Sequence, residues 1–347
     1  MPARTSSPLS ARGRPFSREW RGWRLGLVMT VLCGALAAPG VGASGGPGKR
    51  THSGSSRDAT LTLQVLLDRA GFSVGEIDGA AGAKTRKALI AYQRAQGLPA
   101  TGVADPDTIA ALGGERPSTA AYLITAEDVA GPFVDAIPAD LVAQGELPAL
   151  SYTSPLELIA ERFHASPKLL RRLNPNARFV EGETIAVPGV EPTVFPTQTE
   201  RRNQAPEAAA RTATVIVSKD GRDLVVESVD GQILMYAPVS SGSEHDPLPI
   251  GEWRVTDLYL KPQFNYNPEL FWDADPSHGK TKIPPGPNNP VGLAWIDLDR
   301  EHYGLHGTPE PATVGVTQSH GCVRLTNWDV TRLAALVRPG TRVVFQP

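Results

Sequence analysis

The stretch that decides the fold of the carboxy-terminal half is His306-Gly307-Thr308, followed ten residues later by Ser319-His320-Gly321-Cys322-Val323-Arg324-Leu325. It holds one thiol, two imidazoles, an arginine and three glycines within nineteen positions. A cysteine acts as a nucleophile only as thiolate, so Cys322 needs a partner that takes its proton. His306 and His320 are the two candidates, and the residues alone do not rank them.

The residues next to Cys322 suit acyl transfer. Gly321 has no side chain, so it leaves the neighbouring backbone N–H groups accessible, as an oxyanion hole requires. Arg324 would point to the same side of an extended chain as Cys322, where its guanidinium can hold a substrate carboxylate; a surface ion pair is the alternative. Ser319 is expected to hydrogen-bond within the loop or to substrate, because the thiol beside it is the more acidic nucleophile.

A zinc site made by His306, His320 and Cys322 is the main competing interpretation. Structural zinc usually takes four ligands in short paired spacings such as C-x-x-C, and the chain has no such pair. An inert buried cysteine is a second alternative, but it leaves the flanking His-Gly and Arg unexplained. We therefore expect neither a metal nor a cofactor.

The first residues have the pattern of a secretory signal. Residues 1–24 carry six arginines and one glutamate, and an apolar run over Leu25–Ala38 follows. That run is shorter than the roughly 20 residues that span a bilayer, which favours a signal peptide over residues 1–43. An uncleaved membrane anchor is the alternative.

Removal of that signal changes the formal net charge from −2 to −7 and leaves Cys322 as the single thiol. So acidic a protein has no electrostatic attraction to nucleic acid, and we expect no nucleic-acid partner. A lone thiol in an oxidising compartment cannot form an internal disulfide, which favours a reactive role.

The amino-terminal half divides into segments of different composition. Residues 44–57 are rich in Gly, Ser and basic residues and predict a linker. Residues 58–114 predict three helices: the first ends at Gly71, the second covers Thr85–Gln96 and the third begins at Pro106.

Residues 120–190 predict a small α+β unit, although Pro117 to Pro148 shows no clear pattern. Ser154 with Glu157 three residues later is typical of a capping box at a helix start. A second helix is predicted over Pro167–Leu173, and a strand over Thr184–Val187.

Residues 191–211 lack an apolar period and predict a second linker, after which residues 212–347 change to the period of strands. Strands are expected around Asp220-Gly221 and Asp230-Gly231 turns, at 253–255, at 293–296 and at 342–345, with one helix over Asn327–Val337. Residues 264–277 predict a long loop over the site. Tyr303 and Asn288 are expected to line the groove, with a structural role as the alternative for each.

The His-Gly pair, the loop and the Ser-His-Gly-Cys run with its arginine resemble the signature of the L,D-transpeptidase (YkuD/ErfK) family. The similarity extends upstream through 282–292 and downstream to 340–344, and covers about Thr212–Phe345. Residues 58–114 resemble the three-helix peptidoglycan-binding domain, through Ile77-Asp78-Gly79 and Gln93–Gly102. Residues 120–190 resemble a LysM-type module. The expected fold is therefore multidomain: a small all-α domain, an α+β LysM-like module and a mainly β, sandwich-like catalytic domain.

The resemblance implies roles for individual residues. His306 would be the base and then the acid, Gly307 would orient its ring through a main-chain carbonyl, and His320 would line the oxyanion pocket. Cys322 would take the acyl group of a stem tetrapeptide, release D-alanine and pass the acyl group to an amine. The implied partner is peptidoglycan in the periplasm or cell envelope, with a neighbouring stem or an outer-membrane lipoprotein as acyl acceptor.

Three alternatives remain. Water as the acceptor would make the protein an L,D-carboxypeptidase. A sortase-like transpeptidase also places His before Cys, but usually at a much longer interval than the sixteen residues here, and the common cysteine wall peptidases place Cys before His. A non-catalytic wall-binding protein is the alternative from another class.

Overall fold

The computed structural model describes residues 52–114, 116–196, 198–199 and 212–347. The expected signal peptide, residues 44–51 of the first linker and residues 200–211 of the second lie outside the described residues. None of the helices in the described ranges is long and apolar enough to cross a membrane.

Three helices open the described chain: α1 (His52–Arg69), α2 (Ala83–Ala95) and α3 (Pro106–Ala111). The prediction of a linker up to residue 57 was wrong for residues 52–57, which form the first turns of α1. The apolar period marks only the part of a helix that packs, so it misses a polar extension. As predicted, Gly71 lies just past the end of α1, with a φ of 91° that glycine adopts without strain.

The next segment is a two-stranded sheet with helices between its strands. Strand β1 (Thr119–Leu123) pairs antiparallel with β2 (Thr184–Pro188). The predicted helices are α6 (Pro155–Arg162) and α7 (Pro167–Leu173). The segment without a clear pattern contains β1 and the short helices α4 (Ala126–Ala130) and α5 (Leu141–Gln144).

The capping box predicted at α6 is only half formed. Ser154 accepts from the Glu157 N–H, as expected for an N-cap. The Glu157 carboxylate instead accepts from the Thr153 N–H at 2.6 Å and from the Asn288 side chain at 2.9 Å. A tertiary contact has therefore redirected the glutamate.

These two amino-terminal segments share one hydrophobic core. Ile77, between α1 and α2, is fully buried, and its N–H donates to the His164 carbonyl at 2.8 Å. Leu67 of α1 and Leu169 of α7 belong to the same buried cluster. The segments predicted as separate units thus pack as one amino-terminal body.

The carboxy-terminal half is built on one nine-stranded sheet in the order β5-β4-β3-β13-β7-β10-β11-β12-β6. Its strands are β3 (Thr212–Ser218), β4 (Asp223–Ser228), β5 (Ile233–Pro238), β6 (Ser240–Ser241), β7 (Gly251–Leu260), β10 (Ala294–Leu298), β11 (Gly304–His306), β12 (Val323–Arg324) and β13 (Arg342–Gln346). Strands β8 (Phe264–Tyr266) and β9 (Thr281–Ile283) form a separate hairpin, whose connection contains the 3₁₀ turn η1 (Pro268–Leu270). A second 3₁₀ turn, η2 (Pro311–Thr313), follows β11.

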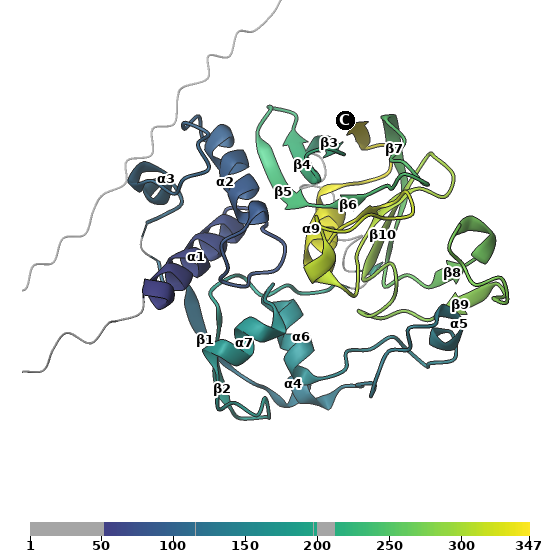
Figure 1. Cartoon of the computed structure of the whole chain (residues 1–347), viewed down its shortest axis with the longest axis horizontal. Coiled ribbons are helices and arrows are strands. Elements are labelled where there is room, and N and C mark those ends of the chain that lie inside the picture. Colours follow the sequence, from purple (N-terminus) through teal and green to yellow (C-terminus); the bar gives the residue numbers. More distant parts are fainter. Residues whose placement is uncertain (1–51, 115, 197, 200–211) are drawn as a thin grey trace, which may run out of the picture. The chain divides into compact units, whose positions relative to one another are not determined.

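The long strand β7 belongs to both halves of this sheet and joins them. Its first residues pair with β13 and its later residues pair with β10, so β7 passes from one half into the other. The edge strands β5 and β6 are joined by Val239 alone, which requires the sheet to curl until its two edges approach. Figure 1 shows helix α9 next to β10.

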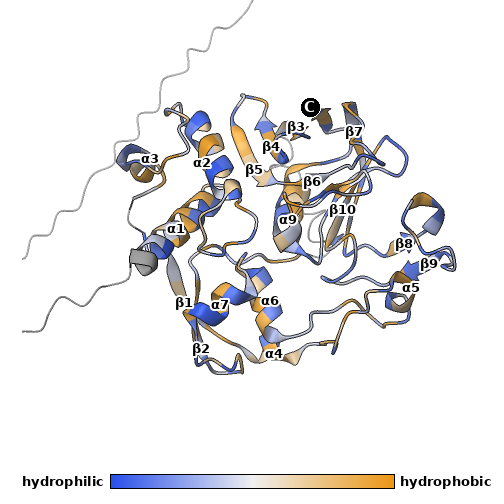
Figure 2. Ribbon diagram, in the orientation of Figure 1, coloured by the Kyte–Doolittle hydropathy of each residue, from blue (hydrophilic) through white to orange (hydrophobic). Residues whose placement is uncertain are grey.

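Helix α9 (Asn327–Leu336) fills the space inside the curled sheet. Its residues Val330, Leu333 and Ala334 are buried in the same cluster as residues of β3, β4 and β10. Strands β5 and β10 are largely orange, that is hydrophobic, in Figure 2. The strands and the helix predicted for this half are confirmed by these elements.

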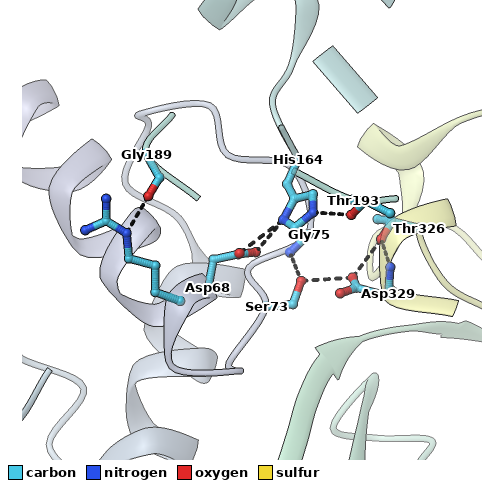
Figure 3. A network of polar contacts seen from close by, with 9 residues as sticks. Asp68, Ser73, Gly75, His164, Gly189, Thr193, Thr326 and Asp329 are labelled. Atoms are coloured by element: carbon cyan, nitrogen blue, oxygen red, sulfur yellow. Dashed lines mark hydrogen bonds and ion pairs between the residues drawn. The ribbon is translucent and has the colours of Figure 1, made fainter. Parts of the chain in front are cut away.

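Buried polar contacts join the amino-terminal body to α9 (Figure 3). The Ser73 hydroxyl donates to the Asp329 carboxylate of α9 at 2.9 Å. Burial raises the pKa of Asp329 to about 6. Nearby, the ring of His164 contacts Asp68 at 3.0 Å and the Thr193 hydroxyl at 2.6 Å.

Candidate active site

The register of three neighbouring strands brings the predicted chemical groups together. On β10, β11 and β12, Trp295 stands opposite His306, and His306 stands opposite Arg324. Leu305 pairs with Val323 in parallel register. The residues before them, Gly304 and Cys322, therefore lie side by side, two positions before the His306–Arg324 pair. Because side chains alternate along a strand, Cys322 and Arg324 project from the face that carries His306. The thiol, the imidazole and the guanidinium all line one pocket.

Cys322 is half-buried, and its Sγ lies 3.5 Å from the His302 carbonyl oxygen. Desolvation raises the pKa of the thiol to about 11, and the nearby Asp297 carboxylate adds to the effect. The positive charge of Arg324 acts in the opposite direction. The resting group at neutral pH is therefore the thiol.

His306 is buried, with 8% of its surface exposed. Its Nδ1 donates to the Gly307 carbonyl at 2.7 Å, and its ring stacks on Trp295 at 5.5 Å between centroids. Burial lowers the pKa of the imidazole to about 4. A neutral ring that donates through Nδ1 has an unprotonated Nε2, which can accept a proton.

Asn327, the first residue of α9, packs its side chain against Gly307. The Asn327 Oδ1 accepts from the Leu293 N–H at 2.9 Å. A Cβ at Gly307 would lie 2.2 Å from that oxygen, and one at Gly292 would lie 2.0 Å from it. Only glycine fits at either position beside this asparagine.

The second histidine has a different environment. His320 is exposed, and its Nε2 lies 2.8 Å from the carboxylate of Asp273 in the β8–β9 connection. Its ring packs against the edge of Phe271 at 5.1 Å. His320 lines the pocket, but its polar contact is with the long loop.

Gly321 needs to be glycine for two reasons. Its φ of 100° lies in the left-handed region, where a side chain is strained. A Cβ would also lie 2.9 Å from the Tyr303 ring. Tyr303 itself lines the pocket and carries the Arg300 guanidinium over its ring at 4.8 Å.

Ser319 and Arg324 tie the loop together. The Ser319 hydroxyl donates to the Cys322 carbonyl at 2.6 Å and accepts from the Gly242 N–H at 2.7 Å. Arg324 donates to the Gln318 carbonyl, and burial lowers its pKa. Both polar positions of the serine are thus used within the protein.

Asn288 does not line the pocket, and its contacts are those of the structural alternative. It is buried, and its side chain donates to the Ser151 carbonyl and to Glu157, each at 2.9 Å. These contacts join the carboxy-terminal half to the start of α6.

The pocket has a volume of about 1290 Å³. The expected loop contributes Phe271 and Asp273 to its wall. Two parts of the pocket were not predicted from the sequence. Trp295 could have been, because side chains alternate along β10 and its position places it on the pocket face. Residues 139–141 lie in a segment with no sequence pattern that would place them there. Within the described ranges, no three His, Cys, Asp or Glu side chains gather as a group that could hold a metal ion.

Each half of the chain contains a segment that matches a known protein family. Residues 212–345 match the YkuD family, described as the L,D-transpeptidase catalytic domain. Residues 56–112 match a family described as a peptidoglycan binding domain.

Two curated relatives carry L,D-transpeptidase names. A Bacillus subtilis protein named as the L,D-transpeptidase YqjB is 33% identical over 137 residues, which cover 38% of this chain and 69% of that protein. A Bacillus licheniformis protein named as the L,D-transpeptidase YkuD is 28% identical over 196 residues, which cover 55% of this chain and 93% of that protein.

Among solved structures, an L,D-transpeptidase from Mycobacterium smegmatis is similar at 19% identity with a TM-score of 0.33. The match covers 40% of this chain and 59% of that structure.

Proposed function

Because this chain belongs to the YkuD family of L,D-transpeptidases, we propose that Cys322 is its nucleophile and His306 its general base and acid. The observation that carries this assignment is the strand register that sets Trp295, His306 and Arg324 in one row beside Cys322. The thiol and the imidazole are both neutral at pH 7, given pKa values of about 11 and about 4. The proton therefore moves from sulfur to Nε2 as the attack proceeds, as in general-base catalysis.

In the first half-reaction, Cys322 Sγ attacks the carbonyl that precedes the terminal D-alanine of a stem tetrapeptide. The proton passes to His306, and the C–N bond to D-alanine breaks as His306 returns that proton to the leaving amine. A thioester remains. The imidazole can perform both transfers because the Gly307 carbonyl fixes its tautomer and orientation.

In the second half-reaction, an amine of a neighbouring stem attacks the thioester. His306 takes the proton of that amine, and the Cys322 thiol is regenerated as the new amide, a 3→3 cross-link, forms. Splitting the reaction in this way produces ping-pong kinetics.

Neighbouring residues complete the proposed site. The N–H groups at Gly321 and Cys322 stabilise the oxyanion, and the Arg324 charge favours both the thiolate and a substrate carboxylate. His320 and Tyr303 form pocket walls for the substrate. Ser319 is assigned to holding the Cys322 peptide, because both of its hydrogen bonds are internal.

The amino-terminal body supports action at the cell wall. Helices α1 to α3 are proposed to bind peptidoglycan, in keeping with the matched family. The β1–α6–α7–β2 arrangement supports a LysM-like module, and the 196-residue match to the Bacillus licheniformis relative extends beyond residues 212–345. Wall binding of this kind raises the effective concentration of stems at the active site. A peptidoglycan-acting enzyme works at the cell envelope, and we assign residues 1–43 to export into the periplasm.

The proposal is tested by intact mass spectrometry of the protein after incubation with a disaccharide tetrapeptide, beside Cys322→Ala. We expect the wild type to gain the mass of the acyl group without D-alanine, with cross-linked dimer in the supernatant, and Cys322→Ala to gain nothing. An adduct with only tripeptide released would instead make the enzyme a carboxypeptidase. An adduct resolved only by a lipoprotein amine would make it a protein anchor. Absence of any adduct, with both proteins still bound to sacculi, would leave a wall-binding protein.

A further inference from the structure

Residues 131–150, which we call the arm, leave the amino-terminal body after α4 and return to it at α6. Figure 1 shows α5, which lies within the arm, beside β9 of the catalytic half. The Leu150 N–H donates to the Pro285 carbonyl at 3.1 Å, and the Asn288 N–H donates to the Leu150 carbonyl at 3.0 Å. The arm is thus hydrogen-bonded to the catalytic half at its end.

Apolar side chains of the arm and of the β8–β9 hairpin form a small core of their own. Leu150 of the arm is fully buried with Tyr266 and Ile283 of the hairpin. The partly buried residues packed against these three are Ile137, Leu141, Val142, Leu147, Phe264 and Phe271. A hairpin of two such short strands has too few contacts to be stable alone, so the arm supplies most of its packing.

A polar contact links the arm to the connection between β8 and β9. Asp140 Oδ2 lies 2.8 Å from His278 Nε2, and the other ring nitrogen of His278 lies 3.1 Å from the Tyr266 hydroxyl. Asp140 also caps α5 by accepting from the Ala143 N–H at 2.7 Å. One aspartate therefore orders both the arm and the loop.

The arm reaches the catalytic pocket itself. Ala139, Asp140 and Leu141 line the same pocket as Cys322. Phe271 connects the two regions, since it packs against the core of the arm and also against the ring of His320. Part of the pocket wall is thus built by the arm, which is distant in the chain from β10, β11 and β12, and by the β8–β9 hairpin, which directly precedes β10.

We propose that the arm is part of the active site: it holds the β8–β9 hairpin as the wall against which the donor stem peptide binds. Asp140 and His278 are positioning residues for that wall. This inference rests on the proposed function, because it concerns how the same site binds its donor. It also gives the amino-terminal body a role in catalysis beyond attachment to the wall.

The test measures acylation kinetics of the full chain with the disaccharide tetrapeptide. Asp140→Ser keeps a good helix cap but does not reach His278. We expect Asp140→Ser and His278→Ala each to raise KM about fivefold, as the loss of one partly exposed ion pair allows. The maximal acylation rate and the rate of Cys322 alkylation by iodoacetamide should stay within about twofold, since neither variant touches the thiol.

Asp135→Ala is the matched control, because Asp135 is an exposed aspartate of the arm that does not line the pocket. It should leave KM unchanged. The double variant Asp140→Ser/His278→Ala should be no worse than His278→Ala, because the two residues act through one contact. An unchanged KM in both single variants would overturn the inference. So would a rise in KM that is matched by an equal fall in the rate of thiol alkylation. A wild type that is never acylated would instead refute the proposed function.

Discussion

The side-chain amide of Asn327 donates to the carboxyl of Glu161 at 3.0 Å, across the boundary between α9 and α6. Glu161 also accepts from the Tyr152 hydroxyl at 3.1 Å. The same asparagine holds the backbone next to Gly307, which orients the ring of His306. The amino-terminal body is therefore in contact with the support of the proposed base.

Asn327→Ala removes this link, leaves the Leu293 N–H and the Pro287 carbonyl without their Asn327 partner, and leaves the Glu161 carboxyl with the Tyr152 hydroxyl alone. The free energy of unfolding should fall by about 2–4 kcal/mol, as expected for buried polar groups left unsatisfied. Urea denaturation measures this change. The exposed Asn176 provides the control, since Asn176→Ala should change stability by less than about 0.5 kcal/mol. Equal stability of the two variants would contradict the assigned role of Asn327.

Glu161→Gln should show a pH-dependent gain in stability. Burial raises the pKa of Glu161 from 4.5 to about 8, so the folded state holds its proton where the unfolded state has lost it. Wild-type stability from this group is complete below pH 4.5 and decreases as the pH rises towards 8, by about 1.4 kcal/mol for each unit of pKa shift. The glutamine side chain can keep the hydrogen bonds without a charge.

The measurement is urea unfolding of both proteins at pH 5 and pH 9. The free energy of unfolding of the variant, relative to that of the wild type, should be higher at pH 9 than at pH 5. A constant difference between them would show that Glu161 does not titrate in this range.

The pH profile of acylation should have its acid limb near pH 4. His306 acts as base only when it is neutral, and burial lowers its pKa to about 4, so activity is lost as the pH falls through that value. Alkylation of Cys322 should increase tenfold per pH unit up to about pH 10, because the thiol pKa is about 11. A plateau of alkylation at neutral pH would instead reveal a thiolate–imidazolium pair in the resting enzyme.

Trp295→Ala should move that acid limb upwards. The indole stacks on the His306 ring and keeps water from it, so its removal returns the imidazole pKa towards 6.5. We expect a shift of about one pH unit in the acid limb of the acylation rate. Trp295→Phe preserves an aromatic cover and should shift the limb much less. An acid limb that is identical in all three proteins would exclude this role for Trp295.

Gly321→Ala should reduce acylation at least about tenfold, because the new Cβ meets Tyr303 and disturbs the peptide that carries the proposed oxyanion donor. Gly340→Ala is a matched control: Gly340 has a φ of 89°, and a Cβ added there would have no heavy atom within 4 Å beyond its chain neighbours. Both variants should lose stability through strained backbone, by about 1 kcal/mol. Only Gly321→Ala should lose acylation, which intact mass spectrometry measures.

The parts of this fold that could be predicted from sequence are those with a local cause. The alternating Val215 and Val217 predicted β3, and the helix after Cys322 followed from its apolar spacing. Cys322 and its two candidate partners, His306 and His320, were predicted from their local pattern, and the resemblance to the family signature placed His306 first. Each of these signals lies within a few residues of the feature it predicts.

What could not be predicted depends on partners distant in the chain. Asn288 has a polar side chain of the kind that lines a groove. It instead donates hydrogen bonds to Ser151 and Glu157, which lie 137 and 131 positions away in the chain. Asp140 belongs to a segment with no period, and it reaches the pocket through tertiary contacts: its own contact with His278 and the packing of Leu150 against Ile283. Distance in the chain is also the reason that the sequence did not reveal the core which the two predicted units share around Ile77.

Strand β13 lies between β3 and β7 and pairs with both, so it connects β3, β4 and β5 to the strand that joins the two halves of the curled sheet. On a ribosome, β10, β11 and β12, which carry the thiol and the imidazole, emerge before the strand that closes their sheet. The sheet cannot be completed until the chain has been synthesised through Gln346. The order of synthesis therefore delays completion of the sheet around the proposed cysteine site until most of the strands that support it exist.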